Sequence, residues 1–143
     1  MKPVLAIVLT AFLALPVWAE EPAFAPKDGT VADLNEFLWK NRPLVVFADS
    51  PADPRFEEQI RLLEEDQPGL ETRDVVVLVD TDPAAKSALR QKLRPRGFMM
   101  VVLAKDGSVI LRKPLPWHVR EIGRAIDKQP LRQQEIRDSH GSE

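Results

Sequence analysis

The sequence of 143 residues contains no cysteine. Its own residues therefore form no disulfide, no thiolate metal site and no thiol nucleophile or redox pair. A basic excess is also missing, because 20 Lys and Arg stand against 22 Asp and Glu and the net charge is −2. This balance excludes the electrostatic pattern of a nucleic-acid-binding protein. The remaining composition, 44% apolar and 29% charged, is typical of one globular domain.

Long apolar runs are confined to the N-terminus. Lys2 precedes an apolar stretch at 4–15, and small residues up to Ala19 resemble a signal-peptidase site. A membrane-spanning helix needs about 20 apolar residues, so cleavage is favoured over an uncleaved anchor. We therefore expect a signal peptide at 1–19, cleaved after Ala19 or after Ala25, and a periplasmic or secreted protein that leaves the membrane on cleavage.

The rest of the chain divides into three parts. We expect a flexible N-terminal arm at 20–29, one domain at 30–130 and a polar C-terminal tail at 131–143. Hydrophobic periodicity, Pro and Gly signals predict the elements of the domain. They are a helix at 30–41, a strand at 44–48, a helix at 54–66, a strand at 75–79, a helix at 82–95, strands at 98–104 and 109–112, and a helix at 115–126.

The order of these elements restricts the fold. The strand-helix-strand unit makes the first two strands parallel, and the Asp106-Gly107 turn makes the last two antiparallel. A continued alternation of strands and helices would indicate a dinucleotide-binding sheet, whereas a terminal hairpin and one helix indicate a thioredoxin-like layout. The sequence therefore predicts a thioredoxin-like three-layer α/β fold with a four-stranded mixed sheet and flanking helices. The expected strand order is second, first, third, fourth.

Individual segments also resemble thioredoxins. Leu44-Val45-Val46-Phe47, followed by a loop and a helix, is similar to their central strand and active-site loop. Where thioredoxins place two cysteines around Gly-Pro, this chain has Ala52-Asp53-Pro54-Arg55, and Met99 stands in the place of their cis-proline. The resemblance implies the scaffold without its thiol chemistry.

An ordered set of motifs resembles domain-of-unknown-function family 4174. The motifs are Pro43-Leu44-Val45-Val46-Phe47-Ala48, Asp53-Pro54-Arg55-Phe56 with Gln59, Arg73-Asp74-Val75, Gly97-Phe98, Lys105-Asp106-Gly107, and Ile126-Asp127 with Pro130-Leu131-Arg132. The resemblance spans residues 30–136. It implies the thioredoxin-like fold and an exported setting, and it assigns no catalytic residue because no established activity accompanies it.

The loop after the first strand is the candidate site for a ligand or a partner. It follows the carboxyl end of the predicted central strand and precedes a helix, the place where open α/β sheets bind ligands. A helix N-terminus offers N–H groups to an anion, but Asp53 and Pro54 are also preferred N-cap and N1 residues and fill that position. The candidate residues are Asp49, Ser50, Asp53, Pro54, Arg55 and Met99.

Other side chains carry weaker chemical signals. Asp80 and Asp82 follow the neighbouring strand, so carboxylates gather at one edge, but their spacing is not that of a calcium loop. Ser50 lacks the flanking glycines that mark the nucleophile of a serine hydrolase. His118 is expected to be a surface residue. Trp117 either anchors the last helix or forms an exposed apolar ledge. We expect no metal and no cofactor.

Two functional hypotheses follow. The first is a redox-inactive binding or adaptor module in the cell envelope, whose partner is an unidentified protein, peptide or small ligand. The alternative is a non-thiol enzyme, with or without a metal, that uses the loop from Asp49 to Arg55. Thiol-disulfide oxidoreductase and cysteine-dependent peroxidase activities are excluded by the composition.

Overall fold

The structure is a computed structural model that describes residues 24–142. The expected signal peptide at 1–19, with cleavage after Ala19, lies outside the described residues. Phe24 opens the described chain and packs against the hydrophobic core. Within residues 24–142, no helix combines the length and the apolar character needed to cross a bilayer.

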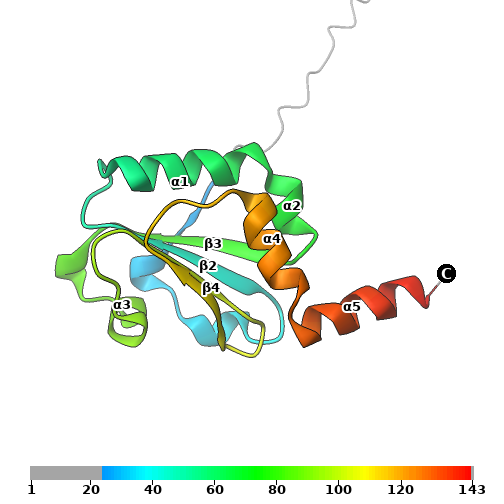
Figure 1. Ribbon diagram of the computed structural model, residues 1–143. Coiled ribbons are helices and arrows are strands. Elements are labelled where there is room, and N and C mark those ends of the chain that lie inside the picture. Colours follow the sequence, from blue (N-terminus) through cyan, green and yellow to red (C-terminus); the bar gives the residue numbers. More distant parts are fainter. Residues whose placement is uncertain (1–23, 143) are drawn as a thin grey trace, which may run out of the picture.

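Five strands form one mixed sheet in the order β1-β3-β2-β4-β5 (Figure 1). They are β1 (Lys27–Asp28), β2 (Arg42–Phe47), β3 (Val75–Asp80), β4 (Met99–Leu103) and β5 (Val109–Lys113). β2 pairs parallel with β3 and antiparallel with β4, and β4 pairs antiparallel with β5. The predicted order of the four strands β3-β2-β4-β5 is confirmed. The prediction of a four-stranded sheet is wrong, because β1 adds a fifth strand.

β1 lies in the segment 20–29, which was expected to be a flexible arm. Lys27 and Asp28 pair parallel with Leu78 and Val79 of β3. Both residues of β1 are exposed, so no apolar alternation marks this strand in the sequence. Its pairing supplies partners to backbone groups at the edge of β3.

Helices cover both faces of the sheet (Figure 1). The α-helices are α1 (Pro54–Glu65), α2 (Gln67–Glu71), α3 (Ala88–Leu93), α4 (Val119–Asp127) and α5 (Pro130–His140), and the short 3-10 turns are η1 (Gly29–Val31), η2 (Leu34–Phe37) and η3 (Pro83–Ala85). α1, α2 and α4 pack on one face, with Leu63 and Ile122 fully buried. η2 and α3 pack on the other face through Phe37 and Leu89. The predicted three-layer arrangement is therefore present.

The helix expected at 30–41 is replaced by the two turns η1 and η2. The side chain of Asp28 accepts a hydrogen bond from the Thr30 N–H, and Asp33 accepts one from the Asn35 N–H. Each aspartate thus opens its own short turn, and Ala32 lies between them in an extended conformation. Local capping therefore prevails over the helical periodicity of the apolar residues.

The segment 131–143, expected as a polar tail, is helical as far as His140. Pro130 occupies the first turn, where its missing N–H costs no hydrogen bond. Gln134 and Asp138 form a side-chain hydrogen bond of 2.9 Å one turn apart. Polar contacts rather than an apolar stripe hold α5, and hydrophobic periodicity does not detect such contacts.

Candidate functional site

The loop at 49–55 connects the end of β2 to the start of α1 and is closed by its own hydrogen bonds. Ser50 Oγ accepts from the Ala52 N–H at 3.1 Å, and the Asp53 N–H donates to the Ser50 carbonyl at 3.2 Å. Asp53 Oδ1 accepts from the Arg55 N–H at 2.8 Å. Asp53 is therefore the N-cap of α1, and its carboxylate occupies the helix terminus where an external anion would bind.

The outer surface of this loop is open to solvent. A shallow, open hollow is lined by Asp49, Ser50, Ala52, Asp53, Pro54 and Arg55. Half of the Arg55 side chain is exposed (51%), and its guanidinium carbon lies 5.8 Å from the centroid of the buried Phe98 ring. The sequence analysis thus located five residues that line one exposed surface.

Met99 does not share this surface. It is the first residue of β4, opposite Phe47 in the antiparallel register, and is half-buried. It packs against the core cluster on the α3 face, which includes Val101 and Leu103. Met99 therefore lies outside the hollow that the other five candidate residues line.

A buried ion pair fixes the base of the loop. The Asp80 side chain is fully buried (0% exposed), and Oδ1 accepts from Arg90 Nε at 3.0 Å while Oδ2 accepts from Ser87 Oγ at 2.5 Å. Arg90 Nη2 also donates to the carbonyl of Ala48 at 2.8 Å and to that of Asp80 at 3.0 Å. Arg90 therefore ties together the ends of β2 and β3 directly before the candidate loop.

This arrangement changes the interpretation of two residues. Asp80 was grouped with loop carboxylates that could hold a cation, but Arg90 and Ser87 occupy both of its oxygens. The sequence did not indicate a role for Arg90, yet only 11% of its side chain is exposed. Among the described residues, no three His, Cys, Asp or Glu side chains gather as a metal site would require.

Trp117 anchors the last part of the domain and does not form an exposed ledge. It is half-buried and packs against the core on the α1 face. The buried Gln59 of α1 donates to the Trp117 carbonyl and accepts from the Trp117 N–H, both at 2.9 Å. This reciprocal pair fixes the chain just before α4.

We expect Asp53→Ala to lower the free energy of unfolding by about 1 kcal/mol, because the variant loses the N-cap of α1. Urea unfolding followed by circular dichroism measures this change. Asp49→Ala is the control, since Asp49 is an exposed residue of the same loop, and its effect is expected to stay within about 0.5 kcal/mol. Equal stabilities of the two variants would contradict the capping role.

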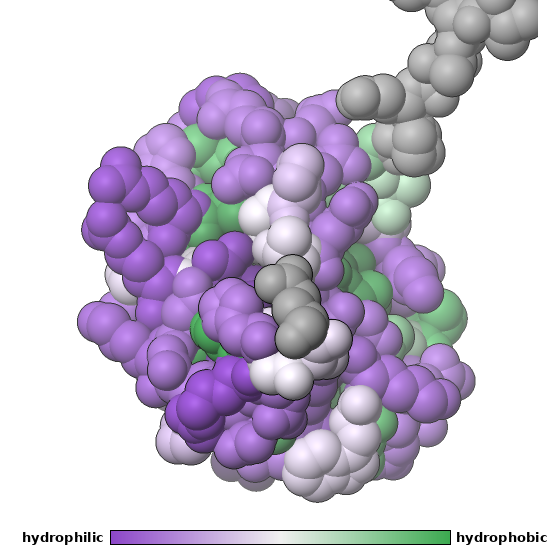
Figure 2. All heavy atoms as spheres, turned by 90° about the vertical axis from the view of Figure 1, so that its right-hand side faces the viewer, coloured by the Kyte–Doolittle hydropathy of each residue, from purple (hydrophilic) through white to green (hydrophobic). Residues whose placement is uncertain are grey.

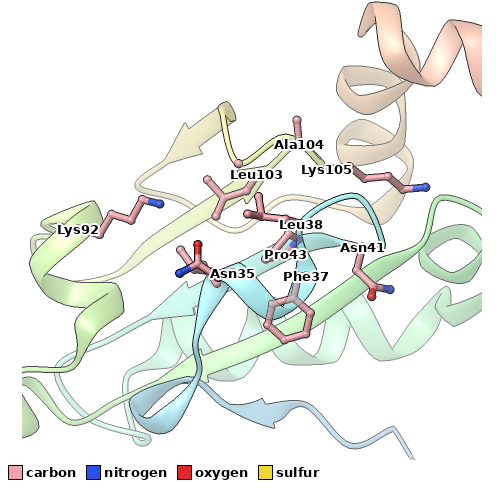
Figure 3. A pocket seen from close by; sticks show the side chains of 11 residues that line it. Asn35, Phe37, Leu38, Asn41, Pro43, Lys92, Leu103, Ala104 and Lys105 are labelled. Atoms are coloured by element: carbon pink, nitrogen blue, oxygen red, sulfur yellow. The ribbon is translucent and has the colours of Figure 1, made fainter.

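A separate apolar hollow lies on the α3 side of the sheet (Figure 3). Its volume is only about 20 Å³, and Phe37, Leu38 and Leu103 contribute its apolar lining. Lys105 borders it, but Figure 3 shows the Lys105 ammonium directed away from Leu38 and Leu103. That ammonium instead contacts the carboxylates of Asp74 and Glu135, each at 2.8 Å.

Lys105 belongs to a group of charged side chains at the other end of β2, which we call the charged cluster. Its members are Arg42, Arg73, Asp74, Lys105, Asp127, Arg132 and Glu135. They come from β2, the β4–β5 turn, the segment before β3, and the helices α4 and α5. The sequence analysis did not single out this cluster, although five of its members lie in the motifs quoted for the family resemblance. Arg42, a basic residue just before the apolar run at 44–48, was the feature of the sequence that could have indicated this cluster.

Ion pairing shifts the pKa values in the charged cluster. The hydrogen bond from Arg73 lowers the pKa of Asp127, and the same bond raises the pKa of Arg73. Burial disfavours the charged form of Glu135, but the hydrogen bond from Lys105 and the charge of Arg42 outweigh it and lower the pKa of Glu135. Arg73, Asp127 and Glu135 are therefore charged at neutral pH.

Known proteins of the same architecture were found among solved structures. A reduced 2-Cys peroxiredoxin from Plasmodium vivax superposes with a TM-score of 0.56 at 15% identity, over 73% of this chain and 85% of that one. Chloroplastic thioredoxin z gives 0.56 at 19% identity, over 73% and 94%. Prx1a from Plasmodium yoelii gives 0.54 at 19% identity, over 73% and 81%. The protein therefore has a thioredoxin-like α/β fold, here without any cysteine.

Within this fold class, the chain belongs to the DUF4174 family, a domain of unknown function whose model matches residues 33–135. Among functionally curated proteins, none matches the chain. The family resemblance expected from the sequence motifs is thus confirmed. The match ends at Glu135, so it includes the charged cluster as well as the loop at 49–55.

Proposed function

We propose that this protein is a redox-inactive, exported thioredoxin-like module that binds a protein, a peptide or a small ligand through the loop at 49–55. The observation that carries this proposal is that the loop is exposed on its outer side and fixed at its base. Its outer surface is exposed and combines charged with apolar groups, while Arg90 and Asp80 hold the strand ends below it. Recognition loops commonly have this combination of a variable surface and a rigid scaffold. Export is supported by the signal-like sequence at 1–19.

The absence of thiols supports the redox-inactive part of the proposal. Neither the loop nor any other part of the 143 residues offers a sulfur nucleophile of the cysteine type. Thioredoxin-like proteins that exchange disulfides need a thiolate to attack the substrate sulfur. The purified protein is therefore expected to reduce insulin no faster than buffer does. A rate above buffer that follows the protein through purification would contradict this part of the proposal.

Site-specific photocrosslinking in cells tests the binding surface. A crosslinking amino acid at Ala52, an exposed residue bordering the hollow, is expected to capture a discrete partner. The same amino acid at Glu64, an exposed residue of α1, serves as the control. Capture at Ala52 should fall when Arg55→Gln removes the exposed charge, while the melting temperature stays unchanged. Equal capture from both positions, or capture that is insensitive to Arg55→Gln and Asp49→Asn, would contradict the proposed surface.

The alternative of a non-thiol enzyme has less support. A metal-assisted reaction needs a set of ligands, and the described residues bring no such set together. Ser50 Oγ accepts a hydrogen bond from the backbone of its own loop, and within residues 24–142 no basic side chain forms a hydrogen bond with it. Binding is therefore the function that the geometry supports best.

A further inference from the structure

Arg42 is a buried cation with an unused hydrogen-bond donor. Its side chain is 1% exposed. Nη1 donates to the carbonyl of Arg73 at 2.9 Å, and Nη2 donates to Oε1 of Glu135 at 3.1 Å. Nε finds no acceptor among the described residues. Buried donors are rarely left without a partner, so this N–H indicates a position for another acceptor.

Glu135 fills only part of the site that Arg42 offers. Its Oε1 is shared between Arg42 Nη2 and Lys105 Nζ, and its Oε2 accepts from Arg132 at 3.3 Å. The Nε and Nη2 groups of an arginine lie side by side and match the two oxygens of a carboxylate. Glu135 engages one member of this pair, and a carboxylate placed differently would engage both.

α5, the helix that carries Glu135, makes few apolar contacts with the rest of the domain. Leu131, Arg132, Glu135 and Ile136 are half-buried, and the other residues of this helix are exposed. Figure 1 shows the end of α5 extending beyond the rest of the domain, and Figure 2 shows a largely hydrophilic surface on that side. Displacing this helix therefore removes little apolar surface from contact.

We propose that Arg42 and Lys105 form a carboxylate-binding site, which Glu135 occupies from α5, and that an acidic segment of a partner protein replaces Glu135 there. Exchanging one carboxylate for another keeps the buried Arg42 neutralised, so the desolvation penalty of an unpaired cation does not arise. An incoming carboxylate on Nε and Nη2 also gains the hydrogen bond that Glu135 leaves unmade.

A protein segment fits this site better than a free acid. The present occupant is itself a peptide side chain, flanked on its helix by the half-buried Leu131 and Ile136. When α5 leaves, the surface under these two residues is open to the apolar side chains of an incoming segment. The proposal does not depend on the loop at 49–55, since Arg42 and Phe47 are the opposite ends of β2.

Chemical rescue of full-length Glu135→Ala tests the carboxylate site. The substitution removes the occupant, and added sodium propionate is expected to raise the melting temperature above its value in sodium chloride of equal ionic strength. The wild type and Glu58→Ala, which removes an exposed carboxylate paired with Arg61, should show no such difference. Absence of a selective rise for Glu135→Ala would overturn the proposal, and Glu135→Gln replaces this variant if it fails to fold.

Peptide binding then tests the acidic segment. A fluorescent peptide with the sequence of residues 129–140 is added to the full-length Glu135→Gln chain, and its anisotropy is compared with that of a peptide in which Gln replaces Glu135. The Glu peptide is expected to bind at least about tenfold more tightly, as the loss of a charged hydrogen bond implies. Lys105→Gln in the same chain should reduce this preference. Equal affinities, or propionate rescue without peptide binding, would overturn the assignment to a protein segment.

Discussion

Replacing Asp80 by Ala is expected to lower the free energy of unfolding by about 3–5 kcal/mol, the loss typical of breaking a buried ion pair from one side. The variant leaves the guanidinium of Arg90 nearly buried without its carboxylate, and Ser87 Oγ loses its acceptor. The remaining bonds of Arg90 to the carbonyls of Ala48 and Asp80 do not compensate its charge. This is the largest electrostatic effect that we expect from a single substitution in the domain.

Urea unfolding of Asp80→Ala, followed by circular dichroism, provides the measurement. Asp82→Ala is the matched control, because Asp82 is exposed and caps η3 through one hydrogen bond to the Ala84 N–H. Its expected cost is about 1 kcal/mol. A loss for Asp80→Ala no greater than that for Asp82→Ala would show that the ion pair does not fix the strand ends. Asp80→Asn is informative as well, since it keeps the shape and an acceptor for Ser87 while removing the charge.

Truncating Ile122 to Ala is expected to lower the free energy of unfolding by about 2–5 kcal/mol, because it opens a cavity in the main core. Ile122 is fully buried on α4 and belongs to the same core cluster as Leu44 of β2 and Leu63 of α1. The neighbouring elements are strands and helices fixed by their own hydrogen bonds, which limits their collapse into the cavity.

Leu115→Ala provides the control for Ile122→Ala. Leu115 is 60% exposed, so its truncation should change the free energy of unfolding by no more than about 0.5 kcal/mol. Both variants are measured by the same denaturant titration, with the slope compared to confirm a shared unfolding transition. An equal, small effect of the two substitutions would contradict the placement of α4 against the sheet.

The strands of the central sheet could be predicted because their environment is uniform. β2 and β4 are buried on both faces, and a continuous apolar run is the direct consequence of that burial. α1 could be predicted from Asp53 and Pro54, which specify a helix start whatever surrounds them. In these elements, the residues that favour the strand or helix locally are also the residues that the surrounding contacts need.

The elements that could not be predicted depend on contacts distant in sequence. β1 consists of two exposed polar residues that are strand only because the edge of β3 pairs with them. α5 is a polar helix whose Glu135 pairs with Arg42, 93 positions earlier in the chain. Neither carries an apolar pattern, so hydrophobic periodicity contains no signal for them.

The candidate site shows the same division. The loop at 49–55 follows from the position of β2, and its N-cap is as expected. The role of Asp80 depends on Arg90 in α3, which the sequence separates from it by η3 and by Lys86 in a left-handed conformation. From the sequence alone, Asp80 at the end of β3 resembles a carboxylate that is available to a ligand. The structure shows that Arg90 already binds it.

The separation of Arg42 and Glu135 also bears on the order of folding. During synthesis, β2 is made before α5. Arg42 therefore cannot pair with Glu135 until nearly the whole chain has been made. The sheet and its apolar layers involve residues up to Ile126 and are available earlier. The ion pairs of Glu135 with Arg42 and Lys105 therefore form together only when β2 and the β4–β5 turn already lie side by side, because the two cations come from these two segments.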